Sequence, residues 1–230
     1  MVEAATARGM PVAGHLGAVT AQQAAELGVR TIEHASGIDL VGPVETLQAA
    51  ARLLGGGGST WLDATILVYD NLANLPTIGN ARYPNLDLVP RSVALSWLNW
   101  RNDIVTRATS DERLGFGRPA SKGRSTLVKM IDDLGGRLVV GSDTPMPFVV
   151  PGVSVHQELE MMAGAGVPPL RAIRAATSAA AEALGRSDLG VVAAGSLADL
   201  VLVAGDPARD IAATRTIRKV IKGGAIVHEA

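Results

Sequence analysis

The feature that most constrains the fold of this chain is a recurring unit: a short apolar run, a turn of small residues, then a helical pattern. Alternation of this kind predicts a parallel sheet with helices packed outside it. Strands are predicted over residues 10–15, 29–34, 61–70 and 137–143. Helices are predicted over 18–28, 42–55, 88–108, 121–136, 154–166 and 168–185, and 71–90 is predicted to be a loop.

The pattern changes after about residue 185. Short β-type runs follow at 198–203, 216–224 and 225–228, with at most a single helical turn around 206–213. We therefore predict two parts, an α/β unit over residues 1–185 and a small β element over 186–230.

Composition narrows the classes of function. The 230 residues include 21 Lys and Arg against 22 Asp and Glu, which leaves no basic surface for binding a nucleic acid. The chain has no Cys, which excludes a disulfide scaffold and thiolate chemistry. No apolar stretch approaches the length of a membrane span, and residues 1–10 lack the layout of a signal peptide. We expect a cytoplasmic protein that acts on a small molecule, with no membrane or nucleic-acid partner.

Three residues that could carry chemistry end three of the predicted strands. His15 ends PVAGH, His34 ends RTIEH and Asp143 ends RLVVGSD. The carboxyl ends of parallel strands are where ligands bind in α/β folds. Two imidazoles and one carboxylate at neighbouring strand ends would form a nitrogen and oxygen metal site.

The residues alone also allow roles without a metal. A single histidine at a strand end is often a hydrogen-bonded structural residue, and Gly-Ser-Asp is a common turn. A nucleotide-binding enzyme on a parallel sheet is a further alternative, but the sequence contains neither of the glycine-rich phosphate-binding motifs typical of that class.

Four segments together carry a resemblance to a known family. They are VVGSDTP (139–145), PGVSVHQELEMMAGAGVPPLRAIRAATSAAAEALG (151–185), DLGVVAAGSLADLVLVAGDPARDI (188–211) and IRKVIKGGAIV (217–227). The chain resembles the C-terminal half of the metal-dependent amidohydrolase superfamily, in its imidazolonepropionase-like and prolidase-like branch. The resemblance runs from about residue 10 to the end and is weakest over 42–120.

The resemblance implies a fold and a site. The fold is α/β, a partial (β/α)8 barrel comprising about strands 5–8, followed by the C-terminal strands of a composite β-sandwich. A divalent metal, with zinc as the expected ion, would be held by His15, His34 and Asp143, and Asp143 would also serve as the general base. The resemblance implies that His156 contacts the substrate or supports a ligand, with a structural histidine packed at a helix N-terminus as the alternative. Tyr69, near the end of the strand predicted over 61–70, is a further candidate contact to the substrate.

The chain departs from the family pattern in two respects. It contains no His-x-His pair, and no lysine precedes Lys122 that could serve as the ligand on the fourth strand. We therefore expect the chain to begin just before the fifth barrel strand. Such a half-barrel would leave strand edges open, so we expect either a homo-oligomer or a missing N-terminal half.

Two hypotheses of function follow from these residues. The first is a metal-dependent hydrolase acting on carbon–nitrogen bonds of small linear or cyclic amides. The second is a catalytically incomplete half-barrel with no activity of its own. Metal content of the purified chain would separate them.

Overall fold

The computed structural model describes residues 2–75, 83, 85–107 and 117–230. The first part alternates strands and helices, as the sequence predicts. Its elements are α1 (Val2–Thr6), β1 (Ala13–Gly14), α2 (Ala21–Glu26), β2 (Thr31–Glu33), α3 (Val44–Gly55), β3 (Trp61–Asp63), α4 (Ile66–Ala73), η1 (Leu86–Leu88), α5 (Arg91–Arg107), α6 (Arg118–Asp133), β4 (Leu138–Val139), α7 (Val153–Gly164), α8 (Pro169–Ala176) and α9 (Ser178–Ala183).

The four strands of this part form one parallel sheet in the order β1-β2-β3-β4. Successive side chains on a strand point to opposite faces. Ile32 and Leu62 therefore lie in the main core with α2, α3 and α6, whereas Trp61 and Val139 pack on the other face with residues of α9. This confirms an α/β fold with a parallel sheet, while the numbering of its strands as 5–8 stays a prediction.

Local sequence explains where individual helices form. Thr20 and Gln23 form a reciprocal capping box at the start of α2. Leu47, Ala51 and Leu54 recur at helical spacing along α3 and are all buried, so one stripe of this helix faces the core. None of the described helices is long and apolar enough to cross a membrane.

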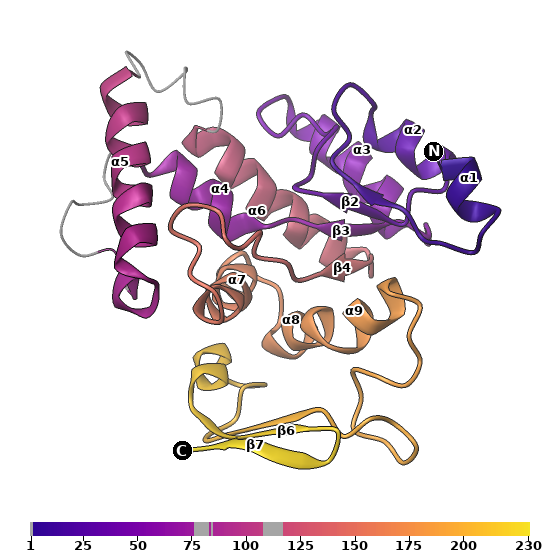
Figure 1. Ribbon diagram of the computed structural model, residues 1–230. Coiled ribbons are helices and arrows are strands. Elements are labelled where there is room, and N and C mark those ends of the chain that lie inside the picture. Colours follow the sequence, from indigo (N-terminus) through magenta and orange to yellow (C-terminus); the bar gives the residue numbers. More distant parts are fainter. Residues whose placement is uncertain (1, 76–82, 84, 108–116) are drawn as a thin grey trace.

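The C-terminal part is a three-stranded antiparallel sheet. It consists of β5 (Leu200–Val203), β6 (Ile217–Lys222) and β7 (Ala225–Glu229), with the 3-10 helix η3 (Ile211–Arg215) between β5 and β6. Helices α7, α8 and α9 lie between the two sheets (Figure 1). Ile211 is buried in the main core, so η3 connects the C-terminal part to the first part. That residues 186–230 form a separate domain stays a prediction.

One predicted strand was wrong in its second half. Residues 61–70 were expected to form a single strand, but β3 ends at Asp63 and α4 begins at Ile66. Thr65 turns the chain with a left-handed backbone, and a carboxylate from a distant helix caps the first turn of α4. These interactions override the strand preference of the run ILVY.

Two further boundaries differ from prediction. The helix expected over 168–185 is two helices, α8 and α9, because the backbone leaves the helical region at Thr177. The loop expected over 71–90 begins later, since α4 continues to Ala73, and it contains η1; residues 76–82 and 84 lie outside the described residues.

Candidate functional site

The structure brings two of the predicted metal ligands together. His15 directly follows β1, and His34 directly follows the neighbouring strand β2. Their ring centroids are 5.2 Å apart, and the rings meet edge to face. His15 is exposed and His34 is half-buried. Two imidazoles therefore stand side by side at the carboxyl ends of two parallel strands.

Asp143 lies in the same neighbourhood. It follows β4 closely and is exposed. Burial is the main effect that lowers the pKa of His34, with smaller lowering by His15 and Arg124, while the charge of Asp143 opposes them. The imidazole of His34 is therefore mainly neutral at pH 7, the form that can bind a metal.

Three residues that closely follow strands of the parallel sheet have an uncommon backbone conformation. His34, Thr65 and Asp143 have φ angles of 63°, 44° and 56°, in the left-handed region. Residues with a side chain adopt this region rarely, at a cost of about 1–3 kcal/mol each, and such strain clusters at functional sites. The strained residues follow β2, β3 and β4, all at the same edge of the sheet.

Hydrogen bonds hold His34 at its ring, its amide and its carbonyl. Nδ1 of the ring lies 2.8 Å from the hydroxyl oxygen of Thr65. The backbone N–H donates to the carbonyl of Asp63 at 2.8 Å, and the backbone carbonyl accepts from Nη2 of Arg124 at 2.7 Å. The backbone of His34 is therefore held by residues of β3 and α6, and its ring contacts the turn before α4.

Tyr69, predicted to contact the substrate, lies beside His34 on α4. The two ring centroids are 5.8 Å apart. The guanidinium of Arg124 stacks on the phenol ring, with its Cζ 3.7 Å from the Tyr69 centroid. Burial raises the pKa of Tyr69, so its hydroxyl stays protonated at neutral pH.

His156, the other residue implied to contact the substrate, faces the C-terminal part. Its Nδ1 lies 3.0 Å from the hydroxyl of Thr214, in η3. Burial lowers its pKa first, and the charges that act on it are those of Arg215 and Glu160. Among the described residues, Tyr69 contacts the ring of His34, whereas His156 contacts η3. A substrate role for His156 therefore stays a prediction.

Sequence reasoning missed a pair of carboxyl groups at the site. Glu33 and Asp63 are register partners on β2 and β3, and both line a cavity of about 410 Å³ on the sheet face away from the main core. Burial, followed by the charges of Glu33 and Glu158, raises the pKa of Asp63 to about 8. The sequence offered one sign of this pair: Glu33 and Asp63 are each a charged residue within a mostly apolar run.

The sequence indicates that Glu158 is a solvated or helix-start residue, and the structure shows that it is not solvated. Its side chain is 1% exposed, and its two carboxylate oxygens accept the backbone N–H groups of Ile66 and Leu67, each at 2.7 Å. Burial raises its pKa to about 7, against the opposing effects of these hydrogen bonds and of Arg124. Glu160, two residues later, is partly exposed and pairs with Arg215.

The match to a known family covers nearly the whole chain. Residues 1–227 match the model of the amidohydrolase family. The chain belongs to the amidohydrolase family. This confirms the resemblance carried by the segments around Asp143 and towards the C-terminus.

Two curated relatives match only a short stretch of this chain, and both are much longer proteins. An adenine deaminase of Methylobacterium sp. (strain 4-46) is 42% identical over 72 residues, 31% of this chain and 12% of that protein. One from Methylobacterium nodulans is 45% identical over 65 residues, 28% of this chain and 10% of that protein. Most of each deaminase therefore lies outside the match.

Solved structures show the fold over the full chain. A Xaa-Pro dipeptidase with bound methionine aligns with a TM-score of 0.67 at 24% identity, over 100% of this chain and 47% of that one. A bottromycin amidohydrolase aligns with a TM-score of 0.71 at 23% identity, over 98% and 52% respectively. The chain thus spans about half the length of these structures.

A metal ion, typical of amidohydrolases, can be tested against the donors present. The adjacent imidazoles of His15 and His34 and the nearby carboxylate of Asp143 are the right donor types for a zinc-like ion. Among the described residues, however, no group of three or more His, Asp or Glu side chains is arranged to hold a metal. The donors therefore fit a metal in chemical type, and the two imidazoles are adjacent, while a metal site at these residues stays a prediction.

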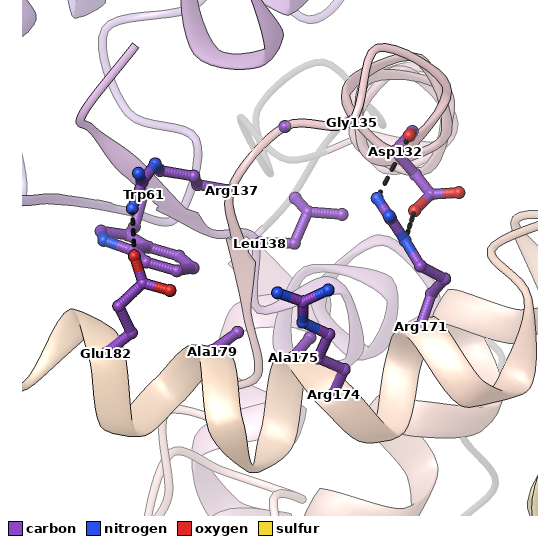
Figure 2. Close-up of a pocket in the computed structure, with 11 residues that line it drawn as sticks. Trp61, Asp132, Gly135, Arg137, Leu138, Arg171, Arg174, Ala175, Ala179 and Glu182 are labelled. Carbon is purple, nitrogen blue, oxygen red and sulfur yellow. Dashed lines mark hydrogen bonds and ion pairs between the residues drawn. The ribbon is translucent and has the colours of Figure 1, made fainter. Parts of the chain in front are cut away.

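A second cavity lies near the amino ends of β3 and β4, at the opposite end of the sheet from the imidazole pair. It measures about 320 Å³ and is lined by residues at the starts of β3 and β4 and by α8 and α9 (Figure 2). Arg137 pairs with Glu182 at 2.7 Å and Arg171 with Asp132 at 2.8 Å across it. Much of its charge is balanced internally, and the cavity is not formed by the imidazole pair.

Proposed function

We propose that the protein hydrolyses a carbon–nitrogen bond of a small linear or cyclic amide with the help of a divalent metal, zinc being the expected ion. The observation that carries the proposal is the imidazole pair of His15 and His34 at adjacent strand ends in an amidohydrolase chain. The names of the similar proteins, a dipeptidase and two adenine deaminases, support this bond type.

Each residue of the site has a proposed role. His15, His34 and Asp143 would hold the metal, which when bound lowers the pKa of a coordinated water and polarises a carbonyl. The carboxylate of Asp143 would accept a proton from the attacking water and deliver it to the leaving nitrogen. Tyr69, beside His34, would donate a hydrogen bond to the substrate.

A second candidate is a catalytically incomplete half-barrel that needs a further copy or a further segment to act. The observation that favours it is the absence of a three-ligand metal group among the described residues. In this case the imidazole pair would bind metal weakly, and hydrolysis would require ligands from elsewhere.

Metal titration of the purified chain separates the two candidates. The wild type, His34→Gln and His228→Gln would be titrated with Zn²⁺, and each would be assayed on a panel of dipeptides and cyclic amides. His228 lies exposed on β7 and serves as the matched control. Stoichiometric zinc and hydrolysis, both lost only in His34→Gln, are expected. Weak or absent zinc binding without hydrolysis would support the half-barrel.

A further inference from the structure

We propose that Thr65 is a positioning residue that keeps the ring proton of His34 on Nδ1 and leaves Nε2 as the nitrogen available to a metal. The link to metal binding rests on the proposed function, whereas the position of the proton does not. Three features of the molecule support this role: the hydrogen bonds of the Thr65 hydroxyl, the unusual cap of α4, and the left-handed backbone at Thr65.

The hydroxyl of Thr65 lies within hydrogen-bond distance of both an acceptor and the ring of His34. It has one proton, which it donates to the carbonyl oxygen of Ala64 at 2.8 Å. The same oxygen lies 2.8 Å from Nδ1 of His34. In the proposed arrangement the proton goes to the carbonyl of Ala64 and the hydroxyl accepts from the ring, so that Nδ1 carries the hydrogen and Nε2 carries the lone pair. Thr65 is 1% exposed, so water does not compete for it.

The hydroxyl of Thr65 is available to His34 because the side chain of Glu158, and not that of Thr65, caps the start of α4. Thr65 is the N-cap residue of α4, where a threonine hydroxyl commonly accepts a backbone N–H of the first turn. Here it makes no such bond. Glu158, from α7, accepts the N–H groups of Ile66 and Leu67 at 2.7 Å each. The carboxylate therefore satisfies the helix and releases the hydroxyl for His34.

The backbone supports the same conclusion. Thr65 has a φ of 44°, a conformation that is an outlier for a β-branched residue. Strain of this kind persists only where the surroundings hold it, and it is typical of functional sites. With Nδ1 directed at Thr65, Nε2 is the nitrogen of His34 left to share a metal with the adjacent ring of His15.

The position of the proton can be read directly by nuclear magnetic resonance. The ¹⁵N shifts of the histidine rings would be recorded at pH 8, where His34 is neutral, and His34→Gln would assign its signals. Wild type and Thr65→Ser should show the Nδ1–H form. Thr65→Val, equal in shape but without the hydroxyl, should shift the population towards Nε2–H.

A matched control removes a different buried hydroxyl. Thr60 is 2% exposed and donates to the carbonyl of Val29 at 3.0 Å, so Thr60→Val alters a buried threonine of the same first part of the fold. It should leave the His34 signals unchanged. An Nε2–H form in the wild type, or an unchanged Nδ1–H form in Thr65→Val, would overturn the proposal.

Metal affinity provides the second measurement. Outer partners of metal-binding histidines typically contribute about 10–100-fold in affinity. Zn²⁺ affinity of Thr65→Val should fall by about that factor and be restored in Thr65→Ser. Equal affinities of the wild type and Thr65→Val would contradict the positioning role. If the wild type binds no zinc, the proposed function fails, and the ring shifts still decide whether Thr65 fixes the proton.

Discussion

Glu33 and Asp63 lie opposite each other on neighbouring parallel strands, and each carboxyl group affects the pKa of the other. Burial raises the pKa of both groups, that of Asp63 to about 8, and further like charges from Glu158 and Asp143 add to the effect. Two interacting carboxyl groups titrate as a pair. The folded protein therefore holds a proton at neutral pH that the unfolded chain would release.

This pair predicts that the free energy of unfolding falls as pH rises. A carboxyl whose pKa is raised in the folded state contributes stability that is complete below its unfolded value, 3.8 for Asp63, and is lost as pH rises through about 8. Urea unfolding between pH 5 and pH 9 should show this decline. Asp63→Asn should make the decline shallower, leaving the part due to Glu158, whereas Asp188→Asn, in a largely exposed ion pair with Arg186, should not. Parallel pH profiles for the wild type and Asp63→Asn would contradict a role for this carboxyl.

Glu158→Ala is predicted to destabilise the fold by about 3 kcal/mol, because two backbone N–H groups of α4 lose their partner and Arg124 loses a buried counter-charge. Glu160→Ala is the matched control on the same helix. It removes only a partly exposed ion pair with Arg215 and should cost less than about 1 kcal/mol. Urea titration followed by circular dichroism measures both.

Similar losses in the two variants would show that the carboxylate of Glu158 is not a significant cap. Glu158→Gln refines the result, since an amide can accept with its single oxygen but carries no charge. It should fall between the wild type and Glu158→Ala.

The sequence predicted the parts of the site that depend on local pattern. An apolar run that ends in His15, His34 or Asp143 before a small-residue turn is visible within a few residues, and parallel pairing places such ends at one edge. The roles of Glu158 and Thr65 were not predictable, because the cap of α4 joins residues 92 positions apart. The same contact explains why a helix begins at Ile66, inside a run that resembles a strand.

Gly141→Ala is predicted to destabilise the protein by about 2 kcal/mol or more, since an added methyl group would overpack the site. A Cβ at Gly141 would lie 1.9 Å from Oδ2 of Asp63, too close for any packed atom. Gly14→Ala, at the end of β1, is the matched control because the described residues leave open space around its Cβ. Thermal unfolding should show a lower midpoint for Gly141→Ala alone.

The cause of that loss can be checked by a second substitution. Asp63→Ala removes the carboxylate that the new methyl group would meet, so Gly141→Ala should cost less in the Asp63→Ala background than in the wild type. Equal costs in both backgrounds would place the strain elsewhere.

Ile211→Ala is predicted to destabilise the first part of the fold although it lies in the C-terminal part. Ile211 is 8% exposed and packs in the main core, whereas Ile226, on β7, is 55% exposed. Removing a buried isoleucine side chain costs about 2–5 kcal/mol, and Ile226→Ala should cost far less. All three tryptophans, Trp61, Trp97 and Trp100, precede residue 186, so their fluorescence reports on the first part alone. Its urea midpoint should fall in Ile211→Ala; an unchanged midpoint would show that the C-terminal part unfolds independently.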